Sequence, residues 1–296
     1  MAHATGQIRI GISGWRYPPW RGVFFPEDLP QRRELEYPSR QFRSIEINGS
    51  FYSLQRHSSW QAWNRETPED FVFSVKGGRY ITHIRRLKEV ETPLANFFAS
   101  GLLDLREKLG PILWQLPPTL KYDPEVLEAF LKLLPHDTRA AVRLARKHDS
   151  KMDGRASIKR QPERPLRHAV EVRHASFQCP EFVEQLRTHN VALVVADTAG
   201  KWPFMEDITS DFLYIRLHGD EELYVSGYTP AALKEWARKI RSWAHGSNPR
   251  RSALTASRAP CTPKGRDVYA YFDNDVKVRA PFDAMSLARM LRVSVQ

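Results

Sequence analysis

Carboxylate and imidazole side chains recur at the ends of short apolar runs along this chain. Glu46, Glu171 and Asp197 are carboxylates that can act as general acids or bases, and His218 can titrate near neutral pH. A reaction that moves a proton needs a donor and an acceptor of this kind. These four residues are therefore the candidate catalytic residues.

Cationic, amide and aromatic side chains stand at similar positions and are candidates for binding a substrate. Lysine and arginine can hold an anion. The loop 14–26 interleaves aromatic residues with two arginines, which suits stacking on a base or a sugar, although the same aromatic residues could serve as packing. The candidate binding residues are Asn48, Tyr52, Lys76, His83, Gln115, Arg173, His174, Arg216, Asn274, Trp15 and Tyr17.

A metal site is an alternative use of the same side chains, and an ion-pair network between them is another. A zinc or manganese site needs three or more converging His, Asp or Glu ligands with little competing positive charge. Carboxylates and cations are interleaved here, which favours a charge-balanced anion site and no obligatory cofactor. A divalent metal remains an option, and its possible ligands are Glu46, Glu171, His174, Asp197 and His218.

The runs that carry these residues have the alternation of β-strands. In the second run, period-two geometry sends Ile45 and Ile47 to one face and Glu46 and Asn48 to the other. Solvent exposure of an antiparallel sheet could also explain one polar face. The eight predicted strands are Ile8–Ser13, Ser44–Asn48, Val72–Lys76, Ile112–Gln115, Ala169–Arg173, Leu193–Asp197, Leu213–His218 and Val268–Asn274.

Helix signals separate most of these strands, which favours parallel pairing with apolar faces under helices and polar faces turned inward. Asp123 and Thr229 are predicted N-caps, each followed by proline. The expected helices are Trp60–Arg65 (capped by Ser59), Pro93–Leu109, Val126–Leu134, Pro180–His189, Ala231–Trp243 and Phe282–Leu291. A length of 296 residues allows two domains, but a single α/β domain over 1–296, a (β/α)₈ TIM-type barrel, fits equally well and is the prediction.

The charge balance favours anionic partners. Lys and Arg number 45 against 34 Asp and Glu, a net charge of +11, although basic charge is also common on ordinary soluble proteins. The segments 146–167 and 245–266 are rich in basic residues and poor in apolar ones. We predict that they are mobile loops inserted before strand 5 and strand 8, either without function or as a phosphate-contacting surface.

Several features bear on the cellular compartment. No run approaches the roughly 20 apolar residues of a membrane span, and Met1–Gln7 lacks the pattern of a secretory signal. Cys179 and Cys261 are distant and belong to no CxxC pair, so neither a disulfide framework nor a cysteine zinc site is indicated. A cytoplasmic protein without a membrane partner is expected.

In order along the chain, several motifs resemble the bacterial and archaeal family of domain of unknown function 72, also called YecE-like proteins. The resemblance spans nearly the whole chain and implies a TIM-type barrel, without implying an activity. Phe177 and Asp273 depart from residues common in the family. The matching motifs are Gly11-Ile12-Ser13-Gly14-Trp15 with Tyr17, Trp20 and Phe25-Pro26, Glu46-Ile47-Asn48 with Phe51-Tyr52, Lys76, Thr82-His83, Gln115-Leu116-Pro117-Pro118, Glu171-Val172-Arg173-His174, Arg216-Leu217-His218-Gly219 and Tyr271-Phe272-Asp273-Asn274-Asp275.

Three hypotheses on function follow. The first is an enzyme that binds a phosphorylated or otherwise anionic ligand at the C-terminal mouth of the barrel, as a phosphoester hydrolase, an isomerase or a lyase. The second is a non-catalytic nucleic-acid-binding protein that uses the basic loops and the aromatic first loop, with affinity that falls steeply with salt. The third is a non-catalytic interaction scaffold. The oligomeric state stays open.

Overall fold

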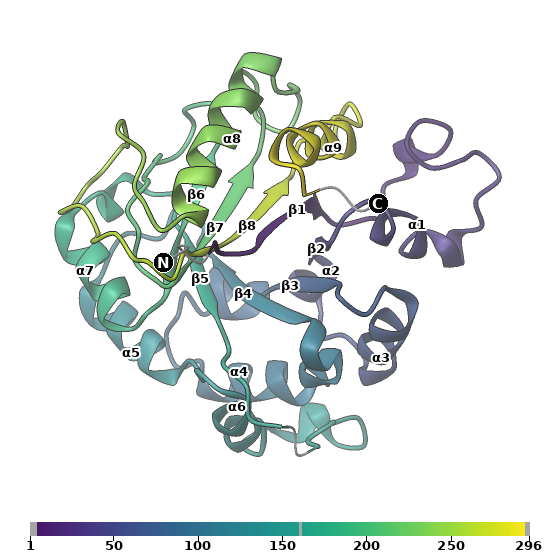
Figure 1. The fold of residues 1–296 in the computed structure, drawn as a ribbon. Helices are drawn as coiled ribbons and strands as arrows, with labels where there is room; N and C mark the ends of the chain where they lie inside the picture. The colour runs from purple at the N-terminus through teal and green to yellow at the C-terminus, as the bar shows by residue number, and fades with distance from the viewer. Residues whose placement is uncertain (1–4, 160–161, 294–296) are drawn as a thin grey trace.

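Eight parallel strands close into a barrel in chain order, with β1 paired to β8 (Figure 1). The computed structural model describes residues 5–159 and 162–293, so residues 1–4 and Arg160, which entered the predictions above, lie outside it. The barrel confirms the predicted (β/α)₈ TIM-type fold. Its strands are β1 (Ile8–Ser13), β2 (Ser44–Ile47), β3 (Val72–Lys76), β4 (Leu109–Gln115), β5 (His168–Glu171), β6 (Ala192–Asp197), β7 (Phe212–Leu217) and β8 (Asp267–Phe272).

Helices surround the barrel in Figure 1, and the long β1–β2 connection forms a separate lobe beside it, drawn in purple. Residues 198–211, all of them described, join β6 to β7 without a helix. The helices are α1 (Glu36–Ser39), α2 (Gly49–Tyr52), α3 (His57–Glu66), α4 (Glu91–Ala99), α5 (Pro124–Leu133), α6 (Thr138–Ala145), α7 (Pro180–Thr188), α8 (Pro230–Ala244) and α9 (Ala280–Leu291). Short 3₁₀ or π turns lie at Pro18–Trp20, Gln31–Arg33, Tyr80–Ile84, Leu102–Lys108, Ser150–Met152 and Ala175–Phe177.

The predicted N-caps Asp123 and Thr229 are present. Asp123 accepts a hydrogen bond from the backbone N of Val126 at 3.2 Å, and Thr229 accepts one from Ala232 at 3.2 Å. Each satisfies a backbone N–H that the first helical turn leaves without a partner. The predicted cap at Ser59 is wrong, because α3 already begins at His57.

The single helix predicted over Pro93–Leu109 is wrong as well. Helix α4 ends at Ala99, and Gly101 adopts φ +100° before the 3₁₀ turn Leu102–Lys108. A side chain at Gly101 would place its Cβ 2.7 Å from the Cβ of His57. The close approach of α3 and the left-handed backbone together require glycine here, and they divide the predicted helix.

The strands have one face under the helices and one face inside the barrel, as the alternation predicts. Ile45 and Ile47 belong to the large apolar core between barrel and helices, whereas Val194 and Tyr271 belong to the core inside the barrel. Burial of each aliphatic side chain stabilises the fold by roughly 1.5–3 kcal/mol. Polar residues on the inward face are separated from solvent by this packing except where they reach the end of the barrel.

Gly77, just after β3, provides a test of this packing. A Cβ at Gly77 would lie 2.3 Å from ring carbons of the buried Trp114, whereas at the neighbouring Gly78 the nearest atom would be 3.8 Å away. We expect Gly77→Ala to lower the free energy of unfolding in urea by about 1–3 kcal/mol, because overpacking forces Trp114 to move. Gly78→Ala is the matched control and should cost little. Equal losses in the two variants would show that the packing described here is wrong.

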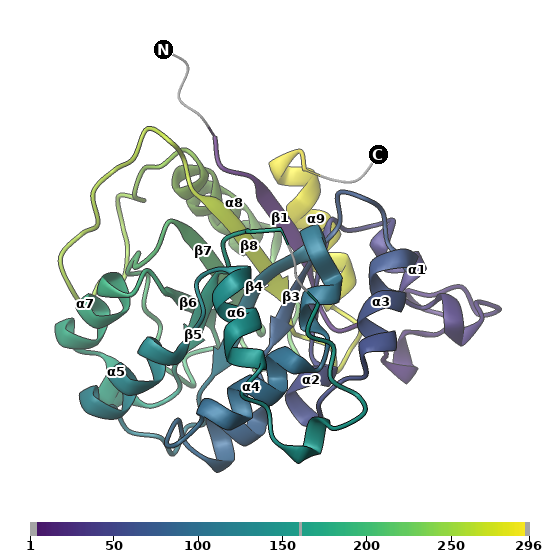
Figure 2. The same cartoon turned by 90° about the horizontal axis from the view of Figure 1, so that it is seen from below.

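Both basic segments make backbone hydrogen bonds to neighbouring parts of the chain. In the first, the backbone N of Ser157 donates to the carbonyl of Ala99 at 2.8 Å. In the second, the buried carboxylate of Asp207 accepts hydrogen bonds from the backbone N of Thr255 and Ala256, each at 2.9 Å. The second segment lies beside α7 in Figures 1 and 2. Their mobility stays a prediction.

Both segments precede a strand, so they connect at the N-terminal ends of the barrel strands. The opposite end of a barrel of this type carries the βα loops. Among the helices within the described ranges, none is long and apolar enough to cross a membrane.

Candidate functional site

An arginine inside the barrel joins three carboxylates. Arg216 lies on β7 without exposed surface. Its Nη2 donates to Glu46 Oε1 at 2.9 Å and to Asp273 Oδ2 at 2.8 Å, and its Nη1 donates to Glu171 Oε2 at 2.7 Å. Burial alone would lower the pKa of Arg216, but the three carboxylates raise it well above its ordinary value. Arg216 is therefore a permanent cation between β2, β5 and the end of β8.

The two glutamates have every carboxylate oxygen engaged. Glu46 also accepts hydrogen bonds from Tyr214 Oη at 2.5 Å and from Ser13 Oγ. The second oxygen of Glu171 accepts from Arg173 Nε at 2.7 Å. Burial would raise the pKa of Glu171, but Arg173 and Arg216 hold it well below its usual range. Both side chains are fully buried and form the floor of the site.

His218 belongs to the same floor. Its Nε2 lies 3.4 Å from Arg216 Nη1, and its Nδ1 lies 3.1 Å from Asp273 Oδ2. Burial and the charge of Arg216 lower the pKa of His218, although Asp273 opposes them. The imidazole is therefore held towards its neutral form and has no exposed surface.

A cavity of about 480 Å³ lies at the C-terminal ends of the strands. This is the end at which TIM-type barrels carry their active sites. Seven of the predicted binding residues line it, and the predicted catalytic residues do not. The lining residues are Tyr17, Asn48, Phe51, Tyr52, Lys76, Arg79, His83, Gln115, Arg173, Tyr224, Asp273 and Asp275.

Cationic side chains contribute to the lining from β3 and β5. Arg173 Nη2 donates to Gln115 Oε1 at 3.0 Å, and its guanidinium lies 3.8 Å from the centre of the Trp202 ring. Lys76 Nζ lies 4.4 Å from the centre of the Phe51 ring. Burial and the charge of Arg216 lower the pKa of Lys76 to about 8. The amine is thus less firmly protonated than an exposed lysine.

His83 lies next to these cations. Burial first, and then the charges of Lys76 and Arg173, lower the pKa of His83 to about 4. Its imidazole is therefore neutral at pH 7 and can offer a hydrogen bond to a ligand without adding charge.

Two carboxyl groups that follow β8 also line the cavity, and their pKa values shift in opposite directions. Burial would raise the pKa of Asp273, but Arg216 lowers it to about 2. Burial and the charge of Asp273 raise the pKa of Asp275 well above its ordinary value. Asp275 Oδ1 is buried and has no hydrogen-bond partner in the part of the chain that the structure describes. Such a divergent pair supplies an acid and a base side by side.

Four predicted site residues belong neither to the lining of this cavity nor to the buried floor beneath it. Val194 and Ala196 point into the barrel, so the period-two alternation turns the next residue, Asp197, outward. There its carboxylate accepts a hydrogen bond from Tyr228 at 3.2 Å. Trp15 is buried and packs edge-on against Trp63 with ring centres 5.5 Å apart.

His174 and Asn274 face outward for the same reason. His174 Nδ1 accepts from the backbone N of Ser176 at 3.1 Å and so caps the turn Ala175–Phe177. Asn274 Nδ2 donates to Asp283 Oδ2 at 2.9 Å, which ties the loop after β8 to α9. Both contacts position loops.

The possible metal ligands are not brought together. Glu46 and Glu171 are bound to Arg216, whereas His174 and Asp197 lie on outward faces. Within 5–159 and 162–293, no group of three or more His, Cys, Asp or Glu side chains is arranged to hold a metal ion.

Five lining residues were missed in the sequence: Phe51, Arg79, Tyr224, Asp273 and Asp275. Two of them carried a signal. Tyr269 and Tyr271 of the last strand point into the barrel. Every second residue after them also points inward, which predicts Asp273, not Asn274, and then Asp275 as lining residues. Arg79 and Tyr224 lie on loops, which have no such periodicity.

A groove of about 650 Å³ adjoins the cavity, with Tyr17, Asn48 and Tyr52 common to both. It runs from the loop after β1 to α3, and Arg16 and Arg32 also line it. The site therefore has room for a ligand that is longer than a simple anion.

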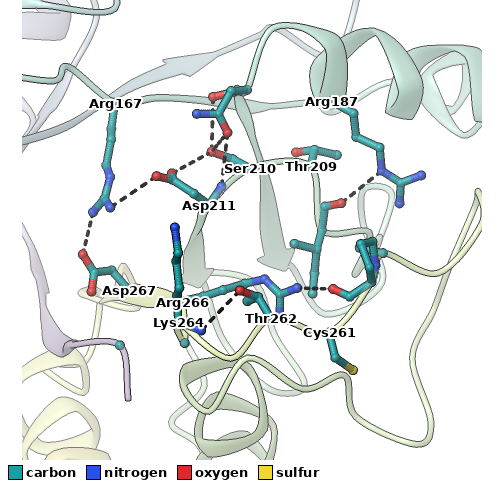
Figure 3. Close-up of a pocket in the computed structure, with 16 residues that line it drawn as sticks. Arg167, Arg187, Thr209, Ser210, Asp211, Cys261, Thr262, Lys264, Arg266 and Asp267 are labelled. Atoms are coloured by element: carbon teal, nitrogen blue, oxygen red, sulfur yellow. Dashed lines mark hydrogen bonds and ion pairs between the residues drawn. The ribbon is translucent and has the colours of Figure 1, made fainter. Parts of the chain in front are cut away.

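A further cavity, of about 530 Å³, lies at the N-terminal ends of the strands (Figure 3). Its arginines already have partners. Arg167 Nη1 donates to Asp267 at 2.7 Å, and Arg266 Nη2 donates to the carbonyl of Pro260 at 2.5 Å. These two arginines are therefore already engaged in contacts within the chain.

The fold and the site together define a TIM-type barrel with a charged cavity at the carboxyl ends of its strands. The model of the family described as "Protein of unknown function DUF72" matches residues 9–296. The chain therefore belongs to the DUF72 family, as its motifs indicated.

Two bacterial proteins are similar in sequence to parts of this chain. The chain is 28% identical over 134 residues to the UPF0759 protein YunF of Bacillus subtilis, across 44% of this chain and 46% of that protein. It is 29% identical over 131 residues to the UPF0759 protein YecE of Escherichia coli K12, across 43% and 44%. Each alignment thus spans less than half of the relative's length.

Crystal structures of DUF72 family proteins share the fold. The protein from Thermotoga maritima superposes with a TM-score of 0.74 at 24% identity, covering 97% of this chain and 99% of that one. One from Enterococcus faecalis superposes with a TM-score of 0.69 at 15% identity, covering 98% and 97%.

Proposed function

We propose that the protein is an enzyme that binds a small molecule with a phosphate or other anionic group in the cavity at the C-terminal mouth and moves a proton on it. The observation that carries the proposal is the composition of one cavity. Lys76, Arg79 and Arg173 line it together with Asp273 and Asp275, whose pKa values diverge.

In this proposal the cations bind the anionic group, the ionised Asp273 acts as the general base and Asp275 as the general acid. Glu46, Glu171, Arg216 and His218 act as positioning residues, because they are buried beneath the cavity. An adjacent acid and base suit isomerisation or elimination, since both reactions move protons. We therefore favour isomerase or lyase chemistry over phosphoester hydrolysis.

Arg79→Met tests the binding half of the proposal. Arg79 is exposed at the cavity, so its loss should leave the fold intact. We expect the affinity for inorganic phosphate, measured by calorimetry, to fall about 10-fold or more, because a charge-assisted hydrogen bond contributes about 1.5–3 kcal/mol. Arg238→Met on α8 is the matched control and should bind phosphate like the unaltered protein. No phosphate binding, or equal affinity in all three proteins, would contradict the proposal.

The pH dependence of anion binding tests the role of Lys76. Sulfate is the suitable probe, because its own charge is constant over this range. We expect its affinity to fall as the pH rises through about 8, where Lys76 loses its proton. Lys76→Arg keeps a cation at all these pH values, so its affinity should change less. A parallel decline in both proteins would assign the effect to another group.

The nucleic-acid hypothesis gains less support. Trp20, Phe24 and Phe25 of the first loop are buried, so their rings are not available for stacking on bases. Both basic segments connect at the N-terminal ends of the strands, opposite the cavity. Nucleic-acid binding would therefore need a separate surface, and it stays an untested prediction.

A further inference from the structure

We propose that the ε-amino group of Lys76 forms a Schiff base with a carbonyl group of the substrate. The ligand would then be an aldehyde, a ketone or an oxo acid that also carries an anionic group. This inference rests on the proposed anion-binding function and specifies its substrate class and its nucleophile.

The position of Lys76 supplies the first argument. It is the last residue of β3, and its side chain lines the cavity. Within the described ranges, Nζ has neither a hydrogen-bond acceptor nor a carboxylate at ion-pair distance, and it lies 4.4 Å from the centre of the Phe51 ring. A lysine that served only the fold would be expected to pair with a carboxylate.

The nearby carboxylates explain why the amine stays unpaired. The carboxylate oxygens of Glu46 and Glu171 accept hydrogen bonds from Arg216, Arg173, Tyr214 and Ser13. Asp273 accepts from Arg216 as well. Because these carboxylates are paired with Arg216, they are not at ion-pair distance from Lys76. Arg216 also places a positive charge beneath the amine.

Both effects favour the nucleophilic form of the amine. Lysines become nucleophilic when they are desolvated or placed beside another cation. Burial and Arg216 lower the pKa of Lys76 to about 8, whereas Glu46, Asp273 and Glu171 oppose this shift. At pH 7 roughly a tenth of the side chain is then neutral, far more than for an exposed lysine.

Asp275 supplies the acid that the reaction needs. Nζ attacks the carbonyl carbon to form the C–N bond, the carbonyl oxygen takes a proton from Asp275, and the nitrogen loses one to Asp273 or solvent. A second proton, delivered to that oxygen from solvent, lets the C–O bond break and water leave, and the nitrogen then gives up its second proton to solvent. The net change is amine plus carbonyl to imine plus water, without oxidation or reduction.

The cations give the carbonyl compound its orientation. Arg79 and Arg173 line the same cavity as Lys76 and can hold the anionic group. The imine nitrogen, once protonated, withdraws electrons from the neighbouring carbon and acidifies its proton. Asp273 and Asp275 are the groups that can then exchange this proton, which agrees with isomerase or lyase chemistry.

Reductive trapping tests the inference. The full chain is incubated separately with pyruvate, dihydroxyacetone phosphate and glyceraldehyde 3-phosphate, and sodium borohydride is then added. We expect a single stable adduct for at least one probe, seen by intact mass spectrometry and mapped to the peptide that contains Lys76. Lys76→Arg should lose at least nine-tenths of the adduct, whereas Lys121→Arg, an exposed lysine outside the cavity, should keep it.

Sulfate binding measured on the same samples separates the two proposals. If the unaltered protein binds sulfate but none of the probes is trapped, the Schiff base is refuted and the anion site stands. If sulfate does not bind, the proposed function itself fails. Adducts spread over several lysines, or equal labelling of Lys76→Arg, would also overturn the inference. Asp275→Asn should slow trapping about 100-fold or more while sulfate still binds, in line with the usual size of acid catalysis.

Discussion

Replacing Arg216 with methionine should lower the free energy of unfolding by about 3–5 kcal/mol, the range for breaking a buried ion pair by removing one partner. Glu46 and Glu171 are fully buried, and Asp273 has only 16% of its side chain exposed. Without the guanidinium, these carboxylates would have to stay charged in a site of low polarity, or take up protons. Urea unfolding at pH 7 measures the loss.

Two further variants make this test specific. Arg238→Met removes a surface ion pair with Glu235, in which Arg238 is 49% exposed, and solvent screening makes the contribution of such a pair to stability small. Arg216→Lys keeps the charge but cannot donate to three carboxylates at once, so its free energy of unfolding should lie between those of the other two variants. A loss below 1 kcal/mol in Arg216→Met would mean that the network is not important for stability.

Acid should destabilise the protein steeply between about pH 4 and pH 2, which is the second large effect. Asp273 has its pKa lowered from 3.8 to about 2, and the pKa of Glu171 is also lowered. A carboxyl whose pKa is lower in the folded state contributes stability that is fully present above its unfolded pKa. That stability disappears as the pH falls towards the folded pKa. For Asp273 alone this amounts to roughly 2 kcal/mol.

The raised pKa of Asp275 acts in the opposite direction, since its folded form binds a proton more tightly than its unfolded form. Urea titrations at pH 6, 4 and 3 measure the sum of these effects. Asp273→Asn should be less stable than the unaltered protein at pH 6 and should lose less on acidification. Equal stability of the unaltered protein at all three pH values would show that the network does not control its acid response.

Much of the fold followed from local signals. Strand alternation such as Ile45-Glu46-Ile47 and caps such as Asp123 depend only on neighbours in sequence, so the sequence was sufficient to predict them. The helix division at Gly101 did not follow, because it depends on the distant contact with His57. Parallel pairing followed from the helices between strands.

The candidate site followed only in part. The period-two alternation of strands, applied strictly, would have excluded Asp197, His174 and Asn274 from the predicted site. It would have included Asp273, because the face of a strand residue is a local property. The pairing of Arg216 with Glu46 and Glu171 is a different kind of fact, since β2, β5 and β7 meet only when the barrel closes.

The sequence by itself thus determined a TIM-type barrel with polar strand ends turned inward, because periodicity and capping are local, and its motifs indicated the DUF72 family that the family model then showed. Only the tertiary structure decided which of these polar residues neutralise one another and which remain for a ligand. Glu46 and Glu171 form ion pairs with Arg216, and Lys76 has no carboxylate at ion-pair distance among the described residues. That division depends on distances between side chains that lie far apart in sequence, and closure of the barrel sets those distances.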